Sequence, residues 1–186
     1  MAERLPRERE PLPLTLVVAR GRALVRQGEP CDAIWIVESG ALMSTIVTAD
    51  GRTLALDVLG SGDIVGEPEG VTSAVTVRAL RPCRVRPARR AEAPKLLATR
   101  AGRVATLACD LAWMGVSGRV ERRLEDLAER FGHPVPEGTR VGIKLSQEDL
   151  AALAGTTRES VNRALSAMQR EGRVRMEARG RYLVRS

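Results

Sequence analysis

Residues 145–172, LSQEDLAALAGTTRESVNRALSAMQREG, constrain the fold more than any other stretch of this chain. Apolar residues recur at helical spacing on both sides of a short Gly-Thr-Thr segment, which predicts two helices joined by a tight turn. Ser146 is placed to cap the first helix, with Asp149 reaching back as in a capping box. Thr157 is placed to cap the second helix.

The crossing of these two helices has the residue types of a helix-turn-helix. Ala151 is small where the helices meet, Gly155 suits the turn, and Val161 is an apolar anchor on the second helix. The second helix buries a stripe at i, i+3, i+4, i+7 spacing, which leaves polar side chains on the open face of its first two turns. These side chains are Arg158, Glu159, Asn162 and Arg163.

The four exposed side chains are suited to reading DNA bases. The start of a recognition helix enters the major groove, where Arg bonds guanine bidentately and Glu accepts from cytosine N4. The alternative is a merely solvated charged surface, and the helix-turn-helix frame argues against it. We assign contacts to DNA phosphates, which add affinity without sequence information, to Ser146, Gln147, Thr157, Arg179 and Arg181.

Basic charge gathers in the same part of the chain. After Gly172, RVRMEARGRYLVRS predicts two short strands around residues 178–180, which would form a wing. Residues 158–186 contain eight arginines and three acidic residues, and the whole chain carries a net charge of +7. A GC-rich coding sequence could also enrich arginine, but the clustering favours double-stranded DNA over an anionic membrane surface.

The rest of the chain divides into a β-rich and a helical part. Short β-type runs broken by glycine, with a hairpin turn at Asp50-Gly51, predict an antiparallel barrel or sandwich over residues 14–85. A helical pattern follows over residues 94–114, and we expect Gly115 and Gly118 to break it before a second helix that ends at Gly132.

The first of these helices carries an apolar a/d stripe at 3, 4, 3 spacing. The stripe could pack on the β-domain, but a helix between two domains with such a stripe often pairs with its symmetry mate, so we expect a homodimer. The residues assigned to the dimer seam are Val104, Leu107, Leu111 and Met114.

From about residue 14 to its end, the chain resembles the cyclic AMP receptor protein and FNR superfamily of bacterial transcription regulators. ALVRQGEPCDAIWIVESGALM, DGRTLALDVLGSGDIVGE and AVTVRALRPCRV are similar to strands and turns of that family's cyclic-nucleotide-binding β-roll, and VSGRVERRLEDLAERFG to the helix that opens its DNA-binding domain. The resemblance implies an α+β fold. Its parts would be a disordered tail (1–11), a β-roll sensor domain (12–93), a dimerisation helix (94–115) and a winged helix-turn-helix domain (116–186).

The resemblance extends to the base-reading residues. LSQEDLAALAGTTRESVNRAL is similar to the family's recognition motif, in which an Arg-Glu pair and an Arg four residues after the Glu read a TGTGA-type half-site. Arg158, Glu159 and Arg163 match these positions in type. The resemblance therefore implies a homodimer on an inverted repeat, an activator role, and RNA polymerase as a partner.

The effector pocket departs from the family pattern. Members that bind cyclic AMP follow a Gly-Glu pair with a longer loop and then an Arg-Ser that holds the cyclic phosphate. Gly66 and Glu67 are present here, but the alignment places Ser73 and Ala74 where Arg-Ser would be. A buried phosphate without a guanidinium would carry an uncompensated charge. We therefore expect no cyclic AMP cofactor, and either an unliganded regulator or one that senses another effector.

Other classes of function find little support. Cys31, Cys83 and Cys109 lie far apart and His133 is the only histidine, so we expect no metal site. We find no phosphate loop, zinc spacing or catalytic pair that would indicate an enzyme. No apolar run or leader indicates a membrane partner or secretion, so we expect a cytoplasmic protein. The alternative to a DNA-binding regulator is a ligand-sensing module whose helix-turn-helix contacts protein.

Overall fold

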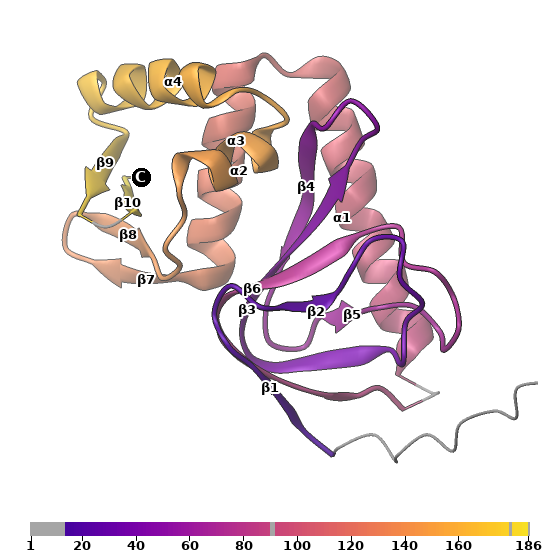
Figure 1. Cartoon of the computed structure of the whole chain (residues 1–186). Coiled ribbons are helices and arrows are strands. Elements are labelled where there is room, and N and C mark those ends of the chain that lie inside the picture. Colours follow the sequence, from indigo (N-terminus) through magenta and orange to yellow (C-terminus); the bar gives the residue numbers. More distant parts are fainter. Residues whose placement is uncertain (1–13, 90–91, 179, 186) are drawn as a thin grey trace, which may run out of the picture.

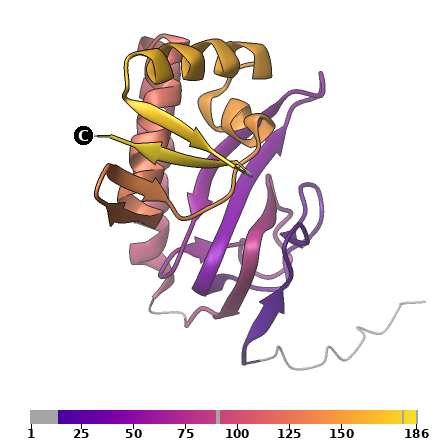
Figure 2. The same ribbon diagram turned by 90° about the vertical axis from the view of Figure 1, so that its left-hand side faces the viewer.

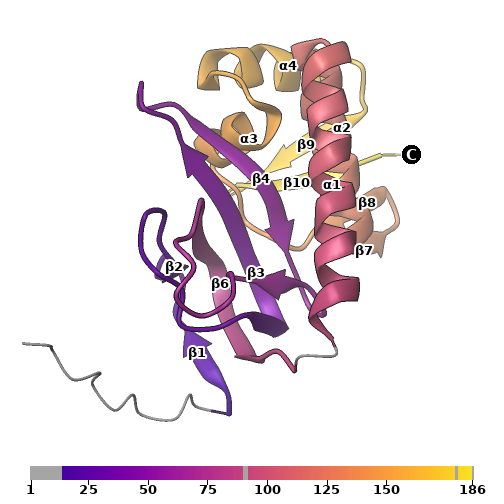
Figure 3. The same ribbon diagram turned by 90° about the vertical axis from the view of Figure 1, so that its right-hand side faces the viewer.

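The structure, a computed structural model, describes residues 14–89, 92–178 and 180–185 (Figure 1). The tail expected over residues 1–11 lies outside them. The sheet-rich N-terminal part and the helical C-terminal part face each other, and a long helix runs along the sheet (Figures 1 and 3). None of the helices in the described ranges is long and apolar enough to cross a membrane.

The N-terminal part is an antiparallel sheet. Its strands are β1 (Leu16–Val18), β2 (Ala23–Val25), β3 (Trp35–Val47), β4 (Thr53–Leu59), β5 (Ile64–Val65) and β6 (Thr76–Pro87). Their order is β1-β6-β3-β4, with β2 on β6 and β5 on β3. The hairpin turn expected at Asp50-Gly51 joins β3 to β4, and Gly51 has the positive φ that favours glycine.

Strand β3 has a buried residue on both faces, which fits its central place in the sheet. Successive strand residues point to opposite faces. Leu42 packs with the core of the sheet itself, whereas Ala41 and Met43 on either side of it pack with the C-terminal part. The sheet therefore contributes to two hydrophobic cores.

Two helices connect the sheet to the C-terminal part. Helix α1 (Ala93–Trp113) lies along β4 and β5, and helix α2 (Val116–Phe131) follows after a break at Met114 and Gly115. The break expected at Gly115 is confirmed. The break expected at Gly118 is wrong, because Gly118 lies in the first turn of α2, where the absence of a side chain leaves room for Met114.

The C-terminal part combines a helix-turn-helix with a second sheet. Its elements are β7 (Gly132–Val135), β8 (Gly138–Val141), α3 (Gln147–Ala154), α4 (Arg158–Arg170), β9 (Val174–Glu177) and β10 (Arg181–Val184). The sheet order is β7-β8-β10-β9, so the expected wing strands β9 and β10 are confirmed. Figure 2 shows the helices and this sheet on one side of the β3–β4 hairpin.

One hydrophobic core spans both parts of the molecule. Met43 and Val58 from the first sheet belong to the same buried cluster as Leu124 of α2 and Leu150 of α3. Leu124 and Leu150 are 0% exposed. The helix-turn-helix therefore packs directly on the sheet.

Candidate nucleic-acid interface

Helix α3 begins and ends as its sequence predicts. The backbone N–H of Asp149 donates to Ser146 Oγ at 3.0 Å, and the backbone N–H of Ser146 donates to Asp149 Oδ2 at 2.9 Å. This reciprocal pair is the expected capping box. The helix ends at Gly155, whose φ of +58° is the left-handed conformation that a tight turn requires.

Three residues, Gly155 to Thr157, separate α3 from α4, and the cap of α4 is also confirmed. The backbone N–H of Ser160 donates to Thr157 Oγ1 at 3.3 Å. The expected apolar stripe is buried and consists of Val161, Ala164, Leu165 and Met168. The packing of this stripe fixes which side of α4 faces outward.

The four residues expected to read bases lie on the outward side of α4. Arg158, Glu159 and Arg163 are exposed, and Asn162 is half-buried. Figure 1 shows α4 along the outer edge of the molecule. Hydrogen bonds from its own backbone N–H and from the Thr157 hydroxyl lower the pKa of the Glu159 carboxyl. The carboxyl of Glu159 is therefore ionised at neutral pH, and both of its oxygens are acceptors.

Arg158 is held by the first helix of the motif. Its Nε donates to Gln147 Oε1 at 3.2 Å, and its Nη1 lies 3.2 Å from Glu148 Oε1. Sequence reasoning missed the role of Glu148. The signal was available, because the capping pattern places residues 147 and 148 in the first turn of α3, close to the start of α4.

The residues assigned to phosphate contacts gather around the starts of α3 and α4. Ser146 and Thr157 cap these helices, and Gln147 bonds Arg158. The backbone N–H of Leu145 donates to the carbonyl oxygen of Gly180 at 2.9 Å, which brings the wing turn beside the start of α3. Arg181 is exposed on β10. Arg179 lies outside the described residues.

Several arginines of the basic C-terminal region are paired with carboxylates. Arg175 lies 3.5 Å from Glu177, and Arg173 pairs with Glu171 and with Glu121 of α2. Counting charges along the sequence could not reveal the contact with α2. The charge available to DNA is therefore concentrated on fewer side chains than the count suggests.

Comparison with known protein families decides the identity of this arrangement. Residues 15–100 match the family model of the cyclic nucleotide-binding domain, and residues 118–186 match that of the Crp-like helix-turn-helix domain. The chain belongs to the Crp/Fnr family of transcriptional regulators. The resemblance noted in the sequence is thereby confirmed, together with the fold class of a cyclic-nucleotide-binding sheet domain followed by a helix-turn-helix.

Known Crp/Fnr regulators resemble the chain over most of its length. The CRP-like cAMP-activated global transcriptional regulator of Mycobacterium tuberculosis is 34% identical over 177 residues, which cover 86% of this chain and 79% of the relative. The CRP-like protein Clp of Xanthomonas euvesicatoria pv. vesicatoria is 30% identical, with 86% and 78% covered. These relatives are transcriptional regulators and not enzymes, as expected.

Solved structures show the same fold. A CRP/FNR-family transcriptional regulator from Thermus thermophilus superposes with a TM-score of 0.81 at 21% identity, covering 92% of this chain and 93% of the other. The c-di-GMP responsive global regulator CLP from Xanthomonas campestris gives a TM-score of 0.76 at 23% identity, with 92% and 93% covered.

Of the four residues assigned to the effector pocket of this Crp/Fnr regulator, Gly66 and Glu67 lie on the side that faces α1. Gly66 has a φ of +89°, and a side chain there would lie 2.6 Å from the carbonyl oxygen of Ala33. Glu67 is half-buried, and its carboxylate lies 3.7 Å from the guanidinium of Arg100 on α1. The Glu67 carboxylate is thus already paired.

The other two residues assigned to the effector pocket are Ser73 and Ala74, and the polar groups of Ser73 bond to neighbouring residues. Ser73 is 2% exposed, and its hydroxyl both donates to the carbonyl oxygen and accepts from the N–H of Val75. Its backbone bonds Glu29 and Gly28. Ala74 is exposed and carries no polar side chain. This loop is therefore closed on its own neighbours.

The expected dimer seam is only partly available on the surface of α1. Leu107 is 2% exposed and has almost no surface left for a partner, so its assignment to the seam is corrected. Leu111 lies against Gly155, and Met114 lies against Gly118. The apolar side of α1 that faces outward differs from the expected seam and shares only Val104 with it. It forms a shallow groove of about 480 Å³ lined by Leu97, Ala101, Val104, Ala105 and Ala108, with Glu67 and Arg100.

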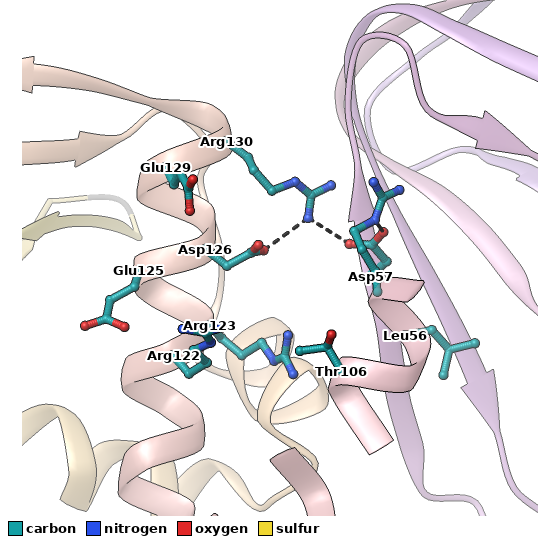
Figure 4. A pocket seen from close by; sticks show the side chains of 10 residues that line it. Leu56, Asp57, Thr106, Arg122, Arg123, Glu125, Asp126, Glu129 and Arg130 are labelled. Carbon is teal, nitrogen blue, oxygen red and sulfur yellow. Dashed lines mark hydrogen bonds and ion pairs between the residues drawn. The ribbon is translucent and has the colours of Figure 1, made fainter. Parts of the chain in front are cut away.

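An ion network joins β4, α1 and α2 at the boundary between the two parts. We call Asp57, Asp63, Arg103, Asp126 and Arg130 the interdomain network. Arg130 Nη1 lies between Asp57 of β4 and Asp126 of α2, at 2.9 and 3.1 Å (Figure 4). Burial alone would lower the pKa of Arg130, but attraction to the carboxylates raises it above its usual value. The network keeps buried charges paired across the boundary.

Proposed function

We propose that this Crp/Fnr regulator binds DNA sequence-specifically as a homodimer on an inverted repeat with TGTGA-type half-sites. The proposal rests on one observation above all. Arg158, Glu159 and Arg163 are exposed together on the first two turns of a capped helix, and the wing turn lies beside the helix before it. This arrangement suits base contacts flanked by phosphate contacts.

We further propose that two chains pair through the outward side of α1. Ala101, Ala105 and Ala108 allow close approach of a second helix, and Trp113 on the same helix is 87% exposed. Recognition of successive major grooves requires a twofold axis there that places the two copies of α4 about 34 Å apart. An activator role, contact with RNA polymerase and a cytoplasmic location are expected from the family resemblance.

Binding to a TGTGA-type palindrome tests the proposal. We expect two chains per duplex in sedimentation experiments, and affinity about a thousandfold or more above that for scrambled DNA at physiological salt. Equal affinity for the scrambled duplex would contradict sequence-specific recognition. One chain per duplex would contradict the dimer.

We also propose that DNA binding is independent of cyclic AMP. No guanidinium in the loop of residues 66–75 offers a partner for a phosphate, Ser73 is bonded within the loop, and Glu67 is paired with Arg100. The name of the Mycobacterium tuberculosis relative states cAMP activation, so the two proteins would differ in this respect.

Calorimetry checks the independence from cyclic AMP. We expect no binding heat at millimolar cyclic AMP and an unchanged affinity for the palindrome, with the Mycobacterium tuberculosis regulator as the positive control. The second candidate is a regulator gated by another effector, for which Glu67 and Arg100 at the edge of the α1 groove offer polar contacts. Micromolar binding of cyclic AMP together with a gain in DNA affinity would overturn our proposal.

A further inference from the structure

Arg119 bridges the joint between α1 and α2 to the turn of the helix-turn-helix. Its Nη1 donates to the carbonyl oxygen of Met114 at 2.7 Å. Its Nε donates to the carbonyl oxygen of Ala154 at 2.7 Å, and its Nη2 to that of Gly155 at 3.4 Å. One half-buried guanidinium therefore contacts the ends of two helices.

The chemistry of helix ends explains why an arginine fits here. The last carbonyl groups of a helix have no partner within it and carry partial negative charge. Met114 caps the end of α1, and Ala154 and Gly155 form the end of α3. A guanidinium has five donors in a fixed plane and can satisfy several such groups at once, which an ammonium group does less well.

Apolar contacts support the same joint. A side chain at Gly155 would lie 2.6 Å from Leu111 Cδ2, and one at Gly118 would lie 3.2 Å from Met114 Cε. The last turn of α1 thus packs against the turn of the helix-turn-helix and against the start of α2. Arg119 closes this joint with polar contacts.

We propose that Arg119 is a positioning residue that fixes the angle between α1 and the recognition helix α4, and thereby sets the half-site spacing that the regulator accepts. The inference rests on the proposed function, because α1 would define the twofold axis and α4 would read each half-site. A small rotation at the joint would move α4 along the DNA by a distance comparable to one base-pair step of about 3.4 Å.

The test measures affinity for inverted repeats that share their half-sites but differ in spacer length by one or two base pairs. For the unchanged protein we expect one spacing to be preferred by about tenfold or more, which corresponds to about 1.4 kcal/mol. In Arg119→Gln the preference should fall to about threefold or less, while affinity for an isolated half-site changes little. Arg119→Lys keeps the positive charge but loses the planar guanidinium. Its spacing preference should lie between those of the unchanged protein and Arg119→Gln.

Arg122→Gln is the matched control. It removes the same charge from the same helix, and the exposed side chain of Arg122 makes no hydrogen bond or ion pair within the described part of the chain. We expect it to keep the spacing preference of the unchanged protein. An unaltered preference in both Arg119 variants would overturn the inference.

Hydrogen exchange provides a second measurement that needs no DNA. In Arg119→Gln, peptides from the α1–α2 joint and from the turn around Gly155 should both exchange faster, and Arg122→Gln should change neither. If only one of the two segments responds, Arg119 does not couple them and the inference fails. If the unchanged protein binds no inverted repeat, the proposed function fails, and the exchange data alone decide whether Arg119 holds the joint. Should Arg119→Gln not fold, Arg119→Lys carries both measurements.

Discussion

Replacing Asp57 by alanine is expected to lower the free energy of unfolding by about 3 kcal/mol, because it removes a buried carboxylate shared by two arginines. Asp57 is 8% exposed. Its oxygens lie 2.5 Å from Arg103 Nε and 2.9 Å from Arg130 Nη1. Both arginines keep a contact with Asp63, at 2.7 and 3.3 Å, so the effect should stay at the lower end of the range for broken buried ion pairs.

Urea unfolding followed by circular dichroism measures this change. The control is Asp50→Asn at the tip of the β3–β4 hairpin, which keeps a residue suited to the turn and removes the charge from a largely exposed pair with Arg52 at 3.1 Å. An exposed pair contributes about 1 kcal/mol or less, so the control should unfold close to the unchanged protein. Equal destabilisation by the two substitutions would show that the interdomain network has no special role.

Replacing Arg163 by alanine is expected to weaken binding to the matching palindrome by about 1–3 kcal/mol per half-site and to relax preference at one base pair. Arg163 is exposed, and in the free protein its Nη2 donates to Ser160 Oγ at 3.0 Å. The guanidinium is thus available to a base. Competition binding against duplexes changed at single positions measures the loss of preference.

Arg181→Ala is the control for this experiment, because it removes the same charge from the wing. We expect it to weaken binding to all sequences alike and to reduce the slope of log K against log salt by about one. If both variants lose affinity uniformly over all sequences, our division between base contacts and phosphate contacts is wrong.

The parts of the fold set by local patterns could be predicted from the sequence. Ser146, Asp149 and Gly155 mark the ends of α3 because capping and turn formation depend on residues close in the chain. The buried stripe of α4 follows from helical spacing in the same way. The outward side of α4, with its candidate base-reading residues, could therefore be located from residue spacing alone.

Contacts between distant segments could not be predicted. Asp149 also pairs with Arg78 of β6, and no local pattern links these positions. Spacing placed Leu107 on an apolar stripe of α1, but it could not tell whether the chain's own sheet or a partner covers that stripe. The three carbonyl contacts of Arg119 are hidden for the same reason, since they depend on how two helix ends meet.

The core that Met43 and Val58 share with Leu124 and Leu150 has a consequence for how the protein melts. Unfolding of either part would expose apolar surface of the other at this core, so we expect the two parts to melt at closely similar temperatures. A fragment cut at the α1–α2 joint would expose this apolar surface to water and tend to aggregate. Any perturbation that loosens the packing of the sheet would therefore also destabilise the recognition helix, because both contribute residues to this core.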